Sequence, residues 1–176
     1  MQQRFKRINV RARPGLRTQG WLTAGPLRFP VALGRGGILA DKREGDGGTP
    51  RGVFRPLRLW WRLDRGPRPR TGLPLRPMRP SDGWCEDPHD RRYNQSIRLE
   101  GNAAGDRLWR DDALYDLVIE IDHNARPRIA GRGSAVFIHI ARAGFTPTAG
   151  CVALRSRDLR RLLEGIGTKT RIRIHK

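Results

Sequence analysis

The residues best suited to covalent chemistry in this sequence are Cys151 and His139. A free thiol has a pKa of about 8.5 and is only slightly ionised at neutral pH, so it becomes a good nucleophile only beside a group that takes its proton. His139 can be that base, because it lies near the end of an apolar, strand-like run. Gly150, immediately before the cysteine, permits a tight turn that points successive N–H groups toward a developing oxyanion. The pattern predicts a nucleophile, a base and an oxyanion hole.

A structural alternative exists for both residues, since buried inert thiols and satisfied core histidines are common. The context favours chemistry. The histidine ends an apolar run, a turn rich in Gly, Pro and Thr follows, and the Gly-Cys pair comes next. An intervening loop of this kind lets the two side chains meet across adjacent strands.

The elements that must hold these residues are mainly strands. Short apolar runs separated by turn-forming residues cover residues 5–10, 27–33, 53–59, 117–121, 135–140 and 171–174. One helix is predicted after the cysteine, with Ser156 as its N-cap and glycines 165 and 167 at its end. Its apolar positions repeat with helical spacing at Leu159, Leu162, Leu163 and Ile166. This helix would pack on the sheet and hold the backbone of the nucleophile rigidly.

The segments between these runs read as turns and loops. Glycine-rich residues 34–37 and 45–50 form turns, and a phosphate-binding loop is not indicated because no Gly-Lys-Ser/Thr follows them. Residues 66–80, rich in Pro and Arg, are expected to form an extended surface loop. Residues 81–112 are expected to be an irregular insertion typical of a binding loop or lid, whose aromatic side chains either line a substrate groove or anchor the loop to the sheet.

The length of 176 residues fits one domain spanning residues 1–176, and we expect a monomer. The formal net charge is +19, and arginine supplies 32 of the 36 basic residues. Three explanations remain open: nucleic-acid binding, attraction to an anionic cell envelope, and the arginine-rich usage of a GC-rich genome. The arginines look dispersed and are accompanied by no DNA-binding motif, so a nucleic-acid partner is not the favoured prediction.

Metal chemistry is weakly indicated. The candidate ligands are scattered, and no paired Cys-x-x-Cys or His-Glu-x-x-His occurs among Cys85, His89, His123 and His139. Neither a metal nor another cofactor is therefore expected. The two cysteines, Cys85 and Cys151, could pair in an oxidising compartment, but that bond would inactivate a catalytic thiol.

No carboxylate pair for acid–base chemistry stands out. Asp111 and Asp112 are expected in a turn, and Glu120 and Asp122 at solvent-facing strand positions. No stretch approaches the length of a transmembrane helix, and the first fifteen residues are basic without an apolar h-region. No conventional export signal is visible.

Two segments resemble one known family. His139, a loop and then residues 148–152, Thr-Ala-Gly-Cys-Val, are similar to the signature of the L,D-transpeptidase catalytic domain (YkuD-like). Upstream, residues 49–54, Thr-Pro-Arg-Gly-Val-Phe, resemble the Thr-Pro-x-Gly-x-Phe segment of the same domain. The two motifs occur in the family's order, and the resemblance extends roughly over residues 27–166.

The resemblance implies a fold of two packed mixed β-sheets, sandwich-like, with one short helix after the nucleophile. It implies a cysteine peptidyl transferase of the bacterial cell wall, in the periplasm or cell envelope, with peptidoglycan stem peptides as donor and acceptor. Cys151 would form a thioester, His139 would move the proton, the carbonyl of Ile140 would orient the imidazole, and the N–H groups of Gly150 and Cys151 would hold the oxyanion. Substrate contacts are expected from Trp84, Tyr93, Thr148 and Arg155.

The sequence departs from the family pattern at three points. The family often has a second histidine at the position of Ala149 and an arginine at that of Ala153, for which Arg155 is the nearest substitute, and the loop between histidine and cysteine is short. These changes leave open whether 3→3 or 1→3 cross-links form. Two other functions also remain open: an L,D-carboxypeptidase, in which water resolves the thioester, and a basic nucleic-acid-binding protein without catalysis.

Overall fold

The computed structural model describes residues 5–100 and 104–176. The prediction of a mainly β protein with one short helix after Cys151 is confirmed. The strands are β1 (Arg7–Arg13), β2 (Leu16–Ala24), β3 (Leu27–Ala32), β4 (Ile38–Leu39), β5 (Thr49–Pro50), β6 (Gly52–Phe54), β7 (Pro56–Trp61), β8 (Leu75–Pro77), β9 (Asp82–Trp84), β10 (Ser96–Arg98), β11 (Asp106–Arg107), β12 (Leu117–Ile121), β13 (Phe137–Ile140), β14 (Val152–Leu154) and β15 (Arg171–His175). The α-helix is α1 (Ser156–Leu163), and short 3-10 turns cover Leu63–Arg65 and Ala143–Phe145.

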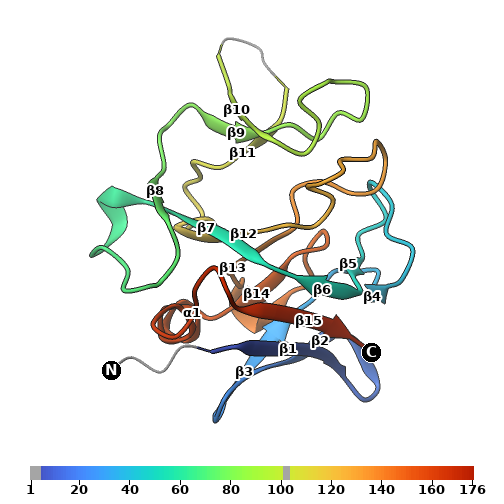
Figure 1. Ribbon diagram of the computed structural model, residues 1–176, viewed down its shortest axis with the longest axis vertical. Coiled ribbons are helices and arrows are strands. Elements are labelled where there is room, and N and C mark those ends of the chain that lie inside the picture. Colours follow the sequence, from blue (N-terminus) through green and yellow to red (C-terminus); the bar gives the residue numbers. More distant parts are fainter. Residues whose placement is uncertain (1–4, 101–103) are drawn as a thin grey trace.

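The main sheet is one ladder of mixed strands that curls back on itself. Its order is β6-β15-β1-β2-β3-β14-β13-β12-β7-β8 (Figure 1). Strands β6 and β7 lie near opposite ends of this order, yet only Arg55 separates them along the chain. The two ends of the ladder must therefore approach each other. The expected two layers are thus the two halves of a single continuous sheet.

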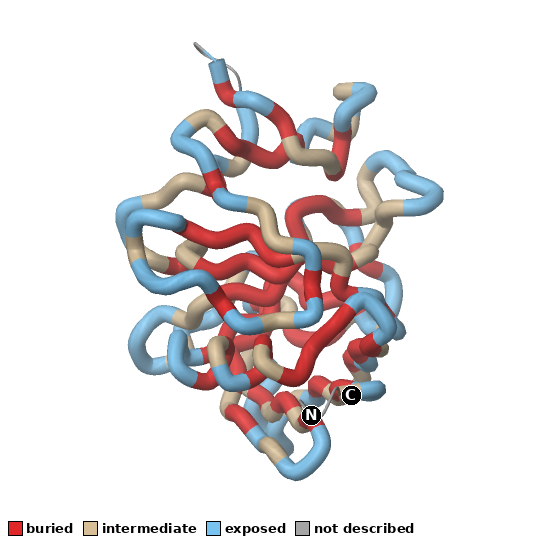
Figure 2. Tube along the Cα trace, turned by 60° about the vertical axis from the view of Figure 1, so that its left-hand side comes forward, coloured by how far each residue is buried: buried red, intermediate tan, exposed pale blue. Residues whose placement is uncertain are grey.

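The two halves enclose one apolar core. Ile8 and Leu22, from one half, belong to the same buried cluster as Leu59 and Ile119, from the other. Helix α1 closes the space between the halves with Leu159, Leu162 and Leu163, and Ile166 just after the helix joins them. The expected helical face is therefore the buried one, and it lies directly after the strand that follows Cys151. The buried segments form the continuous interior of the molecule (Figure 2).

A second, smaller cluster lies on the opposite side of the central strands. Trp60, Val118 and Phe137 point there and meet Trp84 and Leu108 from the insertion. The insertion forms a three-stranded sheet, β10-β9-β11, which lies above β7 and β12 in Figure 1. The expectation of an irregular loop over residues 81–112 is therefore wrong. Because this small sheet covers their second face, the central strands are buried on both sides.

Several local expectations need correction. Residues 66–80 are not a structureless surface loop, because β8 pairs in parallel with β7 and Met78 is buried. Strand β2 was missed, since Gly20 and several polar residues obscure its alternation. The predicted run at 53–59 is interrupted at Arg55, which separates β6 from β7. Helix α1 has Arg155, not Ser156, at its N-cap position, and no side chain caps it.

Candidate active site

Cys151 precedes β14, on the buried side of the chain. Its Sγ donates a hydrogen bond to the carbonyl oxygen of Ala135 at 3.2 Å and accepts one from the N–H of Phe137 at 3.3 Å. Both partners belong to the segment that leads into β13, the parallel neighbour of β14. The side chain is 6% exposed. The thiol is therefore held by main-chain groups at the floor of a pocket.

His139 lies on β13, opposite Ala153 in the parallel register. Its Nδ1 is 2.9 Å from the carbonyl oxygen of Ile140, an acceptor that assigns the ring proton to Nδ1. The edge-to-face ring of Tyr115, with centroids 5.1 Å apart, fixes the imidazole plane from the side. This arrangement leaves Nε2 with a lone pair. His139 and Cys151 line the same pocket, and among the described residues no hydrogen bond joins them directly.

Burial makes the resting pair neutral. It raises the pKa of the Cys151 thiol to about 12 and lowers the pKa of the His139 imidazole to about 4. A preformed thiolate–imidazolium pair is therefore not the resting state at neutral pH. The site contains instead a thiol that can lose a proton and an imidazole that can accept one, which is the requirement for general-base catalysis during attack.

The turn before the nucleophile is built by close contacts between backbones. Gly150 has a φ of +144°, and a Cβ on it would lie 2.8 Å from the carbonyl oxygen of Gly48. Gly34 is equally restricted, because a Cβ there would lie 3.0 Å from the Cα of Gly150. The glycines of the two upstream turns thus let three chain segments pack together. This contact is a physical reason why the upstream motif accompanies the Gly-Cys motif.

The two N–H groups predicted to hold an oxyanion, those of Gly150 and Cys151, differ in their hydrogen bonding. The N–H of Gly150 donates to Oγ1 of Thr148 at 3.1 Å, so it is already occupied. Thr148 Oγ1 in turn donates to the carbonyl oxygen of Cys151 at 2.6 Å. Within the residues that the structure describes, the N–H of Cys151 has no protein partner. Of the two predicted donors, Cys151 therefore has the unpaired amide, and Thr148 closes the turn through its bonds to Gly150 and Cys151.

A buried lysine supports the upstream turn whose Gly48 carbonyl packs against Gly150. Lys42 is 7% exposed, and its Nζ donates to Oδ1 of Asp46 at 2.6 Å. The Asp46 carboxylate also holds this upstream turn, because the N–H of Gly48 donates to Oδ1 of Asp46 at 2.8 Å. Lys42 lines the pocket together with Cys151 and is a cation that favours the ionised thiol.

The pocket around Cys151 has a volume of about 520 Å³ and charges of both signs. The carboxylates of Glu44, Glu86 and Asp106 line it, and the guanidinium groups in its wall come from Arg35, Arg110 and Arg142. Glu86 is exposed to solvent at the rim of the pocket, and partial desolvation there, with like charge from Asp106 and Glu44, raises its pKa to about 7. Such a site suits a ligand that carries both ammonium and carboxylate groups.

The family model of the L,D-transpeptidase catalytic domain (YkuD) matches residues 19–174. The chain belongs to this family. The match confirms the predicted relationship and contains Cys151, His139 and the glycine turns that support them. A search of curated proteins found no significant match. Members of the YkuD family are generally cell-envelope enzymes, and no helix of the described residues is long and apolar enough to cross a membrane.

Three residues predicted to bind substrate lie outside the pocket of this YkuD domain. Trp84 is a core residue, since its Nε1 donates to Asn94 at 3.0 Å and its ring packs edge-to-face on Phe137. Tyr93 is buried and donates its hydroxyl proton to Glu44, so it positions a pocket residue without lining the pocket. Arg155 pairs with Asp158 of α1 at 2.7 Å. Of the four predicted residues, Thr148 lines the pocket.

Two other expectations about polar residues are corrected. Glu120 is not solvent-facing but 8% exposed, and it accepts a hydrogen bond from Nε1 of Trp60 at 2.9 Å and pairs with Arg58 at 3.1 Å. Cys85 and Cys151 are both free thiols, and Cys85 packs separately with Ile97. The carboxylate of Glu120 is therefore a structural group of the core, and the predicted nucleophile Cys151 is not in a disulfide.

Sequence reasoning missed several pocket residues. Tyr115 fixes the imidazole and donates to Asp106 at 2.9 Å, but it stands in a turn before β12 without any motif. Lys42 and Asp46 have an i, i+4 spacing within the upstream segment, and that spacing was the available signal. Among the described residues, no group of three or more His, Cys, Asp or Glu is placed to hold a metal ion.

Proposed function

We propose that this YkuD-family chain is a cysteine-dependent L,D-transpeptidase that cross-links peptidoglycan stem peptides through a thioester acyl-enzyme. The observation that carries the proposal is that His139 on β13 and Cys151, just before the parallel neighbour β14, line one pocket, with the imidazole oriented by the carbonyl of Ile140. The family match supports a peptidoglycan substrate. We place the reaction in the periplasm or cell envelope.

Acylation begins when the thiol turns from the Ala135 carbonyl toward the donor. Sγ attacks the carbonyl carbon of an L-centre in the donor stem, and the thiol proton moves to Nε2 of His139. The N–H of Cys151 stabilises the oxyanion that forms. When the intermediate collapses, the C–N bond to the terminal D-residue breaks, and His139 returns the proton to the departing amine. The product is a thioester with a neutral imidazole.

The second step uses an amine as the acceptor. The nitrogen of the second stem attacks the thioester carbonyl, the C–S bond breaks, and the surplus proton of the amine reprotonates the thiolate through His139. The carboxylates of Glu44, Glu86 and Asp106 favour binding of an ammonium group beside the thioester. Glu86, with a pKa of about 7, is suited to take the proton that converts this ammonium into a nucleophilic amine. This acidic wall favours transpeptidation over hydrolysis.

The test compares purified wild-type protein with Cys151→Ala, using tetrapeptide and pentapeptide stem fragments with and without an amine acceptor. Mass spectrometry should detect a thioester adduct and L,D-linked dimers with the wild type and neither with the variant. Circular dichroism should be unchanged, because removal of one buried sulfur preserves the strands. Carbapenems should acylate the wild type and not Cys151→Ala. Cross-linking that persists in Cys151→Ala overturns the proposal.

The same assay separates the transpeptidase from the L,D-carboxypeptidase. Products shortened by one residue, in equal yield with and without the amine acceptor, indicate hydrolysis and contradict the cross-linking role. The variant Glu86→Gln is expected to lower the ratio of dimer to hydrolysed product several-fold at neutral pH. The cleavage site in a tetrapeptide donor identifies the linkage of the dimer. Loss of the terminal D-residue gives a 3→3 link, and cleavage after the first L-residue gives a 1→3 link.

A further inference from the structure

The chain carries its positive charge unevenly in space. Residues 5–40 and 165–176 contain no Asp or Glu, although Arg and Lys recur throughout both segments. The fold brings these two segments together, because β15 pairs in parallel with β1, which continues through β2 to β3. These strands lie side by side at the lower end of the molecule in Figure 1. An acid-free, basic layer of sheet results.

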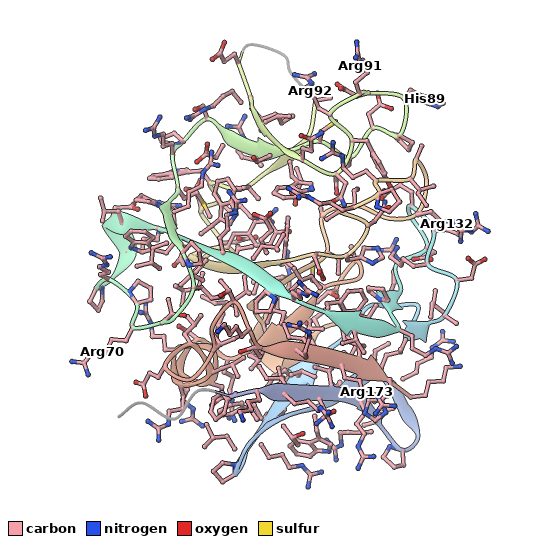
Figure 3. All side chains as sticks on the ribbon, in the orientation of Figure 1. Arg70, His89, Arg91, Arg92, Arg132 and Arg173 are labelled. Atoms are coloured by element: carbon pink, nitrogen blue, oxygen red, sulfur yellow. The ribbon has the colours of Figure 1, made fainter. Side chains whose placement is uncertain are left out.

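The charges gather on the outer side of this layer. Along β1 and β15 the apolar residues Ile8, Val10, Ile172 and Ile174 are buried, so the alternate residues face outward. We define the basic face by the six arginines of these strands and of β3 that lie on the outer side: Arg7, Arg11, Arg13, Arg28, Arg171 and Arg173. Among the described residues, none of the six belongs to an ion pair. The label in Figure 3 marks Arg173 on this layer.

This arrangement opposes folding. Arg7 stands directly beside Arg171 in the parallel register, and like charges at neighbouring strand positions are destabilising. Other arginines of the chain are neutralised locally, as Arg92 is by Asp90 and Arg161 by Glu164. Neutral residues at the outward positions would make the folded state more stable. An anionic ligand provides a reason for the charge to be there.

Apolar side chains accompany the basic face. Leu16 is 46% exposed at the tip of the β1–β2 hairpin, between Arg13 and Arg17. Val53, 60% exposed, pairs across the edge with Arg173. Trp21 lies amid the face, with the guanidinium of Arg28 4.1 Å from its ring centroid. Basic residues interspersed with Trp and Leu are the composition that binds the interface of an anionic bilayer.

We infer that the basic face docks the protein on the surface of an anionic lipid bilayer, with Leu16 entering the headgroup region. A nucleic acid fits less well. The ring of Trp21 already carries the guanidinium groups of Arg13 and Arg28, so it offers no clear stacking platform for a base. Exposed Leu16 and Val53 contribute nothing to phosphate contacts but add apolar area at a bilayer interface.

Vesicle flotation tests the inference with the full chain. Vesicles of equal parts phosphatidylcholine and phosphatidylglycerol should bind the wild type, and pure phosphatidylcholine should not. Neutralising Arg7, Arg11, Arg171 and Arg173 to Gln should weaken the partition by about 100-fold or more, because each cation near an anionic surface contributes substantially. The matched control neutralises the same charge elsewhere, at the exposed Arg68, Arg70, Arg91 and Arg126. Figure 3 shows Arg70 and Arg91 away from Arg173.

The control variant should keep most of the vesicle binding. Equal losses in the two variants overturn the inference, because they would reflect net charge alone. Leu16→Gln should also weaken vesicle binding several-fold and leave binding to duplex DNA unchanged. If the wild type binds the DNA more tightly than the anionic vesicles, or if Leu16→Gln has no effect on vesicles, the bilayer is not the partner. Peptide cross-linking in the absence of vesicles should be equal in all variants. A failure of vesicle binding is therefore distinguishable from a failure of the proposed catalysis.

Discussion

Thr148 and Cys151 are joined by a hydrogen bond of 2.6 Å from the threonine hydroxyl to the carbonyl oxygen of the cysteine. The same hydroxyl oxygen accepts the N–H of Gly150 at 3.1 Å, so one side chain closes the turn that carries the nucleophile. Neither bond uses the N–H of Cys151, which has no hydrogen-bond partner in the part of the chain that the structure describes. The position of the thiol and of the proposed oxyanion donor therefore depends on the side chain of Thr148.

Replacing this hydroxyl should loosen the turn. Thr148→Val keeps the shape of the side chain but removes both bonds, and we expect a loss of about 1–2 kcal/mol in the free energy of unfolding. The rate of carbapenem acylation should fall by about 10–100-fold, because small displacements of reacting groups are costly. Stopped-flow acylation and urea denaturation measure the two effects. Thr148→Ser should restore the rate, and a serine variant as slow as the valine one would contradict this role.

A second prediction concerns the buried pair of Lys42 and Asp46. Asp46→Asn leaves the ammonium group buried without its counter-charge, which costs about 3 kcal/mol or more. Lys42→Met should be milder, since methionine keeps much of the apolar stem that packs near Gly150. Denaturant unfolding with both variants tests the order. Asp41→Asn is the matched control, because the Asp41 carboxylate is exposed and its ion pairs with Arg43 and Arg132 lie at the surface, so its unfolding curve should lie close to that of the wild type.

A third prediction follows from the burial of the thiol. Burial raises the pKa of Cys151 to about 12, so its thiolate fraction at pH 8 is about 1000-fold lower than that of a free thiol of pKa about 8.5. Alkylation by iodoacetamide at pH 8 should be slower by about this factor, measured by intact mass in a Cys85→Ser background. Acylation by a carbapenem should remain fast by comparison, because His139 takes the proton during attack. Alkylation as fast as that of free cysteine would rule out the neutral resting pair.

The placement of His139 and Cys151 at one pocket was predictable because it depends on local spacing. The apolar run before His139 and the turn before Cys151 imply adjacent strands, and they are adjacent. The apolar positions of α1 were equally legible, since the helical period is local. The details that depend on contacts between distant segments were not. Thr148 was predicted to contact substrate, but its two hydrogen bonds within the turn could not be predicted from the sequence.

The errors have a common physical cause. Glu120 alternates correctly for a solvent-facing residue, and sequence gives no sign that the small sheet β10-β9-β11 covers that face. Trp84 belongs to that small sheet, and its packing against Trp60 and Phe137 makes it a core residue and not a groove residue. The arginines looked dispersed along the chain, yet the pairing of β1 with β15 gathers two remote segments into one basic face. Alternation reports which residues share a face, whereas tertiary contacts decide what covers it.

The last prediction concerns acid. Burial lowers the pKa of His139 to about 4, whereas an unfolded histidine titrates near 6.5. Between these values the unfolded chain binds the extra proton, so this group's contribution to stability is complete above pH 6.5 and is lost as the pH falls toward 4. The loss amounts to about 3 kcal/mol. Urea denaturation of wild type and His139→Gln at pH 7 and pH 4.5 isolates it, because other groups titrate alike in both proteins. The stability of the wild type should fall further than that of the variant by about 2–3 kcal/mol. The acid limb of kcat/KM in the wild type should likewise lie near pH 4–5, and a limb at 6.5 would show that the imidazole is solvated.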